Sequence, residues 1–284
     1  MTINNFIPTV WSARILENLN NAHVYAPLLN RDYEGEIRQA GDTVKINSIG
    51  RVAVFDYTKN ADLADPEVLD DSQLILAITE GKAFNFQIDD VDKAQQKPQV
   101  MSEAMREAAW ALADVEDLYV AALLAAGVAT ASPDNTLTAV TLGTGAGDAD
   151  AYETLVNLSV KLDESNVPKN GRWCVIPPWV HGLLSKDPRF VSFNTDAARR
   201  QIRGEPITEI QSMMISVSNN VPVSGSAYTI LAGYKAAATF ADQLTKTEAF
   251  RMEKRFADGI KGLHLYGAKV TRPYALASVA ATAA

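Results

Sequence analysis

A glycine-rich run at residues 143–147 is the first place where the sequence could hold a ligand. The run, Gly-Thr-Gly-Ala-Gly, precedes an expected helix, and glycines let backbone amides approach a phosphate closely. It lacks the closing Gly-Lys-Ser/Thr of a phosphate-binding loop. Asp148 and Asp150 follow it, and their charges would repel an anion. The pattern therefore favours a linker over a phosphate site.

The histidines and the cysteine could also carry chemistry. His23, His181 and His264 lie in three different segments, and none is paired at the spacing of metal ligands. Cys174, the single cysteine, stands in an apolar run with only Arg172 as a basic neighbour. No serine stands in a Gly-x-Ser-x-Gly elbow. We therefore expect no catalytic residue, no metal and no cofactor, and predict that the chain is not an enzyme.

Composition limits the class of protein. The chain has 284 residues, 47% of them hydrophobic, which is enough to bury a substantial core. Its net charge of −8 disfavours tight coating of nucleic acid or an anionic membrane. No run of about 18 apolar residues and no basic N-terminal signal is present, so neither a membrane span nor secretion is expected. Synthesis in the cytoplasm follows.

Residues 98–126 give the strongest helical pattern. Pro98 suits the first turn of a helix, and Gly127 suits the position just past the end. At 1.5 Å per residue the helix would be roughly 40 Å long, which is typical of a spine. Apolar residues recur at spacings of four and three and predict one packing face: Met101, Met105, Ala108, Leu112, Val115, Tyr119, Ala122 and Ala126.

Alternating residues predict strands on both sides of a long polar excursion. Val44 and Ile46 share one face of the first strand, and Leu74 and Leu76 share one face of the second. The polar residues 56–72 lie between them. Loops this long are uncommon in compact domains, and a lone two-stranded ribbon is marginally stable in water. We expect the ribbon to protrude and to rest on another molecule.

The second half of the chain alternates helices and strands. Residues 129–148 are expected to form a small-residue linker, and Asp150 with Glu153 forms a capping box at the start of a helix. Residues 173–176 suit a central strand of a compact α/β domain. The tail, residues 275–284, is expected to fray at its end.

Charge is distributed unevenly between two polar segments. The excursion is acidic, whereas residues 185–206 are basic, so the acidic tip of one subunit could lie beside the basic segment of a neighbour and set its orientation. Two independently solvated loops are the alternative, and both interpretations stay open. The candidate contact residues are Asp62, Asp65, Glu67, Asp70, Asp71, Arg189, Arg199, Arg200 and Arg203.

Several segments resemble major capsid proteins of tailed bacteriophages with the HK97-like fold. The strongest is the run 84–95, from Phe84 to Gln95, followed by a helix that carries Asp114 and Asp117. Residues 218–222 and 266–275 are similar as well. The matches follow the family's order over most of the chain.

This resemblance implies an α+β fold with five parts. They are an N-terminal arm (1–41), an extended two-stranded β loop (42–90), a peripheral domain with the spine helix (91–127), an axial α/β domain (128–243), and the peripheral return strands with the C-terminal tail (244–284). One departure is that residues 208–213 lack the glycines that the family often carries ahead of the axial strand.

The resemblance implies a coat protein of a phage virion. Such a protein self-assembles through hexamers and pentamers into an icosahedral head around double-stranded DNA, which it contacts without sequence specificity. The long charged N-terminal extension that some members use as a fused scaffold is missing, which implies a separate scaffolding protein or none. A portal, decoration proteins and assembly in the bacterial cytoplasm are expected, and no membrane is involved.

Two other functions stay open at this point. An encapsulin-like nanocompartment shares the fold and would enclose an enzyme cargo in place of DNA. A phosphate-binding enzyme would use the glycine-rich run at residues 143–147.

Overall fold

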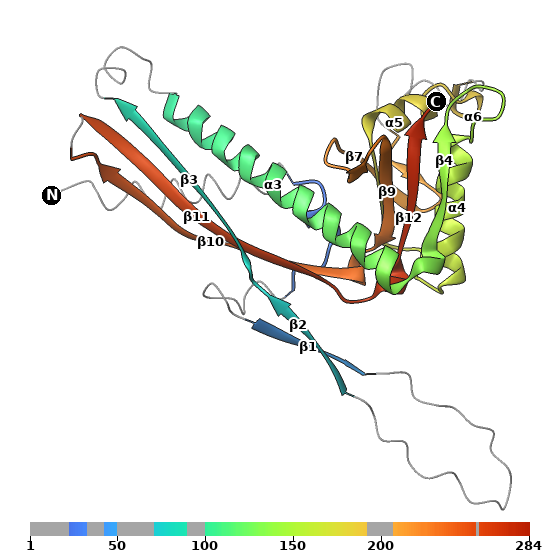
Figure 1. Ribbon diagram of the computed structural model, residues 1–284, viewed down its shortest axis with the longest axis horizontal. Coiled ribbons are helices and arrows are strands. Elements are labelled where there is room, and N and C mark those ends of the chain that lie inside the picture. The colour runs from blue at the N-terminus through green and yellow to red at the C-terminus, as the bar shows by residue number, and fades with distance from the viewer. Residues whose placement is uncertain (1–22, 33–42, 50–70, 90–99, 192–206, 254–255) are drawn as a thin grey trace, which may run out of the picture.

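The protein has an elongated part, a compact part and a projecting hairpin (Figure 1). The computed structural model describes residues 23–32, 43–49, 71–89, 100–191, 207–253 and 256–284. In the elongated part a long helix lies along a three-stranded sheet, and the compact part is built on a seven-stranded sheet. No helix among the described residues is both long and apolar enough to cross a membrane.

The long helix α3 spans Val100–Ala131 and runs past its predicted end. Gly127 is therefore inside the helix, not just beyond it. A Cβ atom at Gly127 would lie 2.7 Å from a γ-methyl group of Val270, which is too close for packing. The glycine permits α3 to approach the end of a neighbouring strand, and this close contact, not helix termination, explains its place in the sequence.

The buried face of α3 differs from the predicted stripe beyond Leu112. Val115 is 40% exposed, and Ala122 and Ala126 are exposed as well. The prediction was wrong there because two carboxylates, Glu116 and Asp117, are buried on the packing face at 0% and 1% exposure. The remaining buried residues of α3 are Met105, Ala109, Leu112, Ala113, Val120, Ala121, Leu124 and Val128.

The three-stranded sheet is antiparallel, in the order β10-β11-β3. Its strands are β10 (Ala238–Arg251), β11 (Ala257–Val270) and β3 (Glu80–Asp89). The predicted boundaries of the extended loop, residues 42–90, include residues 80–89, but β3 pairs with β11 along its whole length. Phe84 and Phe86 pack with Ile260 against Met105 of α3, so the apolar face of β3 keeps it in this sheet.

The projecting hairpin consists of β1 (Thr43–Ile49) and β2 (Asp71–Ala77). They pair antiparallel from Thr43 opposite Ala77 to Ile49 opposite Asp71, which confirms the predicted pairing of the two strands. At its base, Ile46 and Leu76 pack with Leu265 of β11. Figure 1 shows the rest of the hairpin extending away from the three-stranded sheet.

The seven-stranded sheet runs in the order β4-β12-β9-β5-β7-β6, with β8 paired to β9. Its strands are β4 (Thr136–Leu142), β5 (Arg172–Ile176), β6 (Glu209–Ile210), β7 (Met213–Val217), β8 (Val223–Ser224), β9 (Ala227–Tyr234) and β12 (Leu276–Ala283). Three helices accompany the sheet: α4 (Ala151–Glu164), α5 (Pro178–Leu184) and α6 (Pro188–Val191). Short 3₁₀ turns lie at Ala26–Leu28 (η2), Pro133–Asn135 (η4), Lys235–Ala237 (η5) and Pro273–Ala275 (η6). Asp150 caps α4 by accepting a hydrogen bond from the amide of Tyr152 at 2.8 Å.

Two segments of this sheet were predicted wrongly. The expected linker 129–148 contains strand β4, and the expected fraying tail contains strand β12, which lies between β4 and β9. Ala277, Val279 and Ala281 of β12 have no exposed surface. A strand covered on both faces has no need for polar residues at alternate positions, so its short apolar run lacked the period of two that identifies half-exposed strands.

Candidate functional site

Most of the predicted contact residues lie outside the described part of the chain: Asp62, Asp65, Glu67, Asp70, Arg199, Arg200 and Arg203. Asp71 is described as the first residue of β2 and pairs with Ile49. The acidic excursion and the basic segment are therefore not brought together by any described contact.

Arg189 is bound within its own chain. Its Nη1 lies 2.9 Å from Asp150 Oδ2, and its Nη2 lies 3.3 Å from Glu153 Oε1. Nη1 is also 3.5 Å from Asp187 Oδ2, and the guanidinium carbon lies 5.0 Å from the centre of the Tyr152 ring. Arg189 thus fastens α6 to the first turn of α4, where acidic side chains already favour the helix dipole.

The glycine-rich run binds a carboxylate of its own chain. The amide of Gly145 donates a hydrogen bond to Asp148 Oδ2 at 2.9 Å, and a Cβ at Gly143 or Gly145 would collide with the same carboxylate. The place that a phosphate would take is therefore filled by Asp148. Cys174 is equally unsuited to nucleophilic chemistry because complete burial raises its pKa to about 12.

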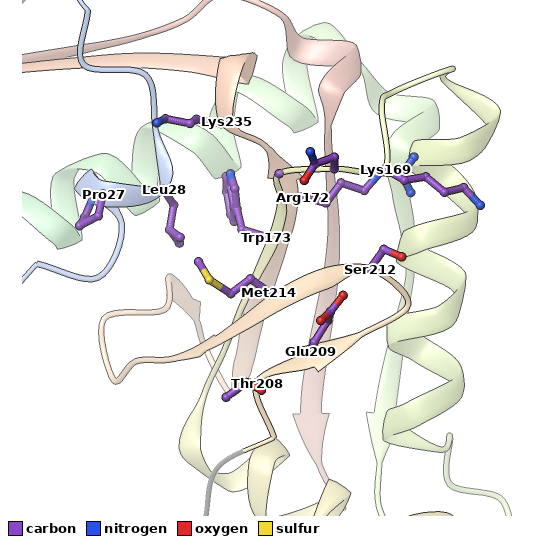
Figure 2. Close-up of a pocket in the computed structure, with 12 residues that line it drawn as sticks. Pro27, Leu28, Lys169, Arg172, Trp173, Thr208, Glu209, Ser212, Met214 and Lys235 are labelled. Atoms are coloured by element: carbon purple, nitrogen blue, oxygen red, sulfur yellow. The ribbon is translucent and has the colours of Figure 1, made fainter. Parts of the chain in front are cut away.

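An open depression lies where η2, the turn before β5 and the β6–β7 hairpin meet (Figure 2). Leu28, Trp173 and Met214 line it, and of these Met214 gives the exposed apolar surface, at 51% exposure. Arg172 also lines it, but its Nη2 donates to Asp163 Oδ1 at 2.7 Å and is not free to bind a ligand. This mixture of apolar surface and satisfied charge suits contact with another protein surface better than catalysis.

A cluster of buried ionisable side chains lies between α3 and the three-stranded sheet. Glu116 Oε2 is 2.9 Å from His23 Nε2, and Glu116 Oε1 contacts Nδ1 of His264. On the other side of the imidazole ring, His264 Nε2 lies 3.6 Å from Asp242 Oδ2, and Arg31 Nη2 lies 2.6 Å from Asp242 Oδ1. Burial alone would lower the pKa of His264, but the contacts with Asp242 and Glu116 raise it to about 9.

Asp117, the neighbour of Glu116, is stabilised by backbone amides. Its two carboxylate oxygens accept hydrogen bonds from the amides of Val24 at 2.8 Å and Tyr25 at 3.1 Å. Burial raises the pKa of Asp117, and these hydrogen bonds from backbone amides oppose the rise. Sequence reasoning missed the cluster because His23 and His264 lie near opposite ends of the chain. The one local signal was a pair of carboxylates adjoining the apolar stripe of a helix.

Glu116, Asp242 and His264 raise the question of a metal ion because one potential ligand atom from each lies within 4.8 Å of the others. A metal ligand needs a ring nitrogen with a free lone pair. Each ring nitrogen of His264 instead faces a different carboxylate without a well-formed hydrogen bond, which is the arrangement of an imidazolium ion-paired with two anions. The donor set therefore fits an ion cluster and not a metal centre.

Exposed apolar residues mark surfaces that are available for contact between subunits. On α3, Trp110 is 64% exposed and Leu118 is 46% exposed. Trp110 and Val217 line a shallow groove, where Asn220 Nδ2 donates to Asp114 Oδ1 at 2.8 Å. Exposed apolar residues that gather along one helix are typical of interaction sites. Phe256, after the β10–β11 turn, is 80% exposed, and Ile75 on the hairpin is 51% exposed.

This architecture is shared with known proteins. The sequence profile of a phage capsid protein family matches residues 72–279. The chain belongs to that family. The solved structure of a protein of Mycobacterium phage Che8 superposes with a TM-score of 0.70 at 27% identity, covering 90% of each chain. The capsid structure of cyanophage P-SCSP1u gives a TM-score of 0.69 at 18% identity, covering 93% of this chain and 88% of that one.

This capsid protein therefore has the HK97-like fold and is a major capsid protein of the virion. Its role is structural, and many copies assemble into a shell. A virus-like particle from Pyrococcus furiosus also shares the fold, with a TM-score of 0.54 at 11% identity over 96% of this chain and 98% of that one. The encapsulin-like alternative is not favoured, because the matching family is that of phage capsid proteins. No curated protein sequence matches the chain.

Proposed function

We propose that this capsid protein forms the hexamers and pentamers of an icosahedral head that encloses double-stranded DNA. In this proposal the seven-stranded unit is the axial domain, and α3 with the three-stranded sheet is the peripheral domain. The observation that carries the proposal is the hairpin β1–β2. Among the described residues it has only two strands and is packed only at its base, and such ribbons are marginal in water. A neighbouring subunit would supply the missing support.

The exposed side of α3 provides a second contact. Trp110 and Leu118 lie two helical turns apart and present apolar surface beside the groove at Val217. Aromatic residues in such positions are frequent hot spots of protein interfaces. Because each subunit meets several neighbours, modest contacts of this kind add up over a closed shell.

The acidic tip of the hairpin is proposed to orient neighbouring subunits. Asp62, Asp65, Glu67, Asp70 and Asp71 would face Arg199, Arg200 and Arg203 of the next copy. Arg189 is already held by Asp150 and Glu153, so it would take part only by sharing its charge. Complementary charges of this type set orientation and encounter rate more than affinity.

Further partners follow from the proposed role. A separate scaffolding protein would guide assembly in the host cytoplasm, a portal would occupy one vertex, and decoration proteins would bind the finished shell. The net charge of −8 suits a wall that holds packaged DNA without binding its sequence.

The test is assembly of purified subunits that carry Ile75→Ser or Trp110→Ala. Ile75 pairs with Lys45 on the exposed side of the hairpin, so its replacement leaves the buried base intact. We expect folded subunits with normal circular dichroism that form few or no shells in negative-stain micrographs. Val160→Ser is the matched control because Val160 is 45% exposed on α4, away from both surfaces. Shell yields equal to wild type for both variants would contradict the proposed contacts.

A further inference from the structure

The turn before β5 carries the single Asn-Gly pair of the sequence, Asn170 followed by Gly171. Both residues are exposed. Gly171 has a φ of 84°, which residues with a side chain rarely adopt, so the conformation of the turn requires glycine there. The pair lines the open depression together with Lys169 and Lys235 (Figure 2).

The reactive groups of the pair are not held by hydrogen bonds. Within the described ranges, neither the side-chain amide of Asn170 nor the backbone amide of Gly171 has a hydrogen-bond partner. The exposed Asn219 differs, because the backbone amide of the next residue, Asn220, donates to Ser218 Oγ at 3.0 Å. A bonded amide is withheld from reaction, whereas the amide of Gly171 is available.

A free backbone amide beside an asparagine side chain permits an internal substitution. Once base removes the proton of the Gly171 amide, its nitrogen attacks the side-chain carbonyl carbon of Asn170, and the new C–N bond closes a cyclic imide. The bond from that carbon to Nδ2 breaks, and Nδ2 takes up a proton and leaves as ammonia. Water then opens the imide at either carbonyl, which gives aspartate or isoaspartate. Glycine favours the attack because no Cβ shields its nitrogen.

Both products change the depression. Each adds a negative charge next to Lys169, and isoaspartate also inserts a carbon atom into the main chain of the turn. Arg172 closes this turn: its Nε donates to the carbonyl of Pro168 at 3.0 Å, and its Nη2 donates to the carbonyl of Val167 at 2.6 Å. A longer main chain between Pro168 and Arg172 would displace the guanidinium from these carbonyls and loosen the turn.

We propose that Asn170 with Gly171 is a self-modification site, which converts through a cyclic imide to aspartate or isoaspartate with water as the only co-reactant. Because the depression suits contact with another protein surface, the reaction changes the charge of that surface after the subunit has folded. The proposal concerns one subunit and holds whether or not the proposed hexamers and pentamers form.

Mass spectrometry of the full chain tests the proposal. The folded protein is kept in solution at neutral and at mildly alkaline pH and is then digested briefly with chymotrypsin. Cleavage after Leu162 and Trp173 yields residues 163–173, which contain both Asn166 and Asn170. We expect amide to become acid at Asn170, faster in alkali because the first step removes a proton. Asn166 is exposed too but should keep its amide, because the following amide of Val167 donates to the Leu162 carbonyl at 3.0 Å.

A synthetic peptide of residues 163–173 gives the rate of the reaction without the fold. Segments with few hydrogen bonds open at little free-energy cost, so Asn170 in the folded chain should convert within about tenfold of the rate in the peptide. Asn170→Gln is the matched control, because glutamine keeps the amide but must close a larger ring. It should stay unmodified under the same conditions.

Asn170→Asp separates the effect of the added charge from that of the longer main chain. Chains with isoaspartate, isolated by chromatography, should unfold at a lower urea concentration than wild type, because the contacts of Arg172 are displaced. Asn170→Asp should unfold at nearly the wild-type concentration. Equal midpoints for the isoaspartate chains and Asn170→Asp would contradict the loosening of the turn.

Two results would overturn the proposal. One is an Asn170 that keeps its amide in the folded chain over a period in which the peptide converts, because the fold would then protect the pair. The other is equal conversion of Asn166 and Asn170, which would mean that the turn contains no selective site.

Discussion

At the residue scale, the two adjacent carboxylates of α3 are stabilised by different partners. Glu116 lies between the imidazoles of His23 and His264, whereas Asp117 accepts two backbone amides. Hydrogen bonds from backbone amides stabilise a carboxylate through their dipoles and need no ionised partner. The Asp117 contact therefore does not depend on the charge of another side chain. The Glu116 contact does, because it relies on a group that titrates.

Glu116→Gln is expected to destabilise the subunit by about 3 kcal/mol, because it removes the negative charge that His23 and His264 face in a buried cluster. Urea unfolding followed by circular dichroism measures the change. The matched control is Lys261→Gln, which breaks an exposed pair whose Nζ lies 2.9 Å from Glu248 Oε2 and should cost less than about 1 kcal/mol. Equal losses of unfolding free energy in the two variants would show that the buried cluster stabilises the subunit no more than an exposed ion pair does.

The stability of the subunit should fall as the pH rises from neutrality through about 9. The pKa of His264 is higher in the folded protein than its ordinary value of 6.5, so its contribution is complete below pH 6.5 and disappears above about 9. The loss is at most about 3.5 kcal/mol, since each pH unit between the two pKa values corresponds to about 1.4 kcal/mol. Melting temperatures of wild type and His264→Gln should converge across this range; a constant difference from pH 6 to pH 10 would exclude the histidine as the cause.

At the element scale, two glycines decide how closely α3, β11 and β3 pack. Gly127 lets the helix pass directly over Val270 at the end of β11, and Gly262 lies under the ring of Phe84 with no room for a Cβ. β3 is held in the sheet by that ring and by its full pairing with β11. The helix and the sheet therefore pack along their length and do not merely touch at one end.

Gly127→Ala is expected to destabilise the protein by about 1–2 kcal/mol, although alanine is the better helix former by about 1 kcal/mol. The new methyl group would lie 2.7 Å from Val270. The double variant Gly127→Ala with Val270→Ala should recover most of the loss, which denaturant unfolding measures. The control Ala126→Gly, at an exposed position of the same helix, should cost about 1 kcal/mol. It measures the difference in helix propensity between alanine and glycine without a change in packing. A stabilising Gly127→Ala would refute the close-contact explanation.

At the scale of the whole molecule, α3 connects two parts with different packing. It begins beside the three-stranded sheet and ends next to the seven-stranded sheet (Figure 1). Strands β10 and β11 return along the helix, and β12 then completes the compact part, so the chain passes between the parts more than once. Such repeated crossing fixes their arrangement, while the hairpin β1–β2 packs against the other described residues at its base.

Replacement of residues 43–77 by a short glycine-serine linker is expected to leave a folded subunit that forms no shells. Thr43 and Ala77 are opposite each other in the pairing, so a few residues bridge the gap. Circular dichroism should report intact structure, and sedimentation velocity should find only small species at concentrations where wild type assembles. The point variant Val160→Ser is again the control. Closed particles formed by the deletion variant would show that the hairpin is dispensable for assembly.

Local sequence patterns predicted the elements whose residues alternate between core and solvent. The paired strands around Ile46 and Leu76, the long helix, and the cap at Asp150 all have local patterns, because each element has one polar and one apolar side. The capsid fold was indicated by the resemblance of segments such as residues 84–95, 218–222 and 266–275 to the family, in the family's order.

The remaining features depend on contacts between distant parts of the chain. Strand β12 is apolar on both sides and carries no period, so its place between β4 and β9 could not be read locally. Gly127 resembled a helix end until Val270 was seen against it. The cluster of His23, Glu116 and His264 joins residues that are distant in the chain, and whether a charged side chain is solvated or buried with partners depends on contacts that no local pattern encodes.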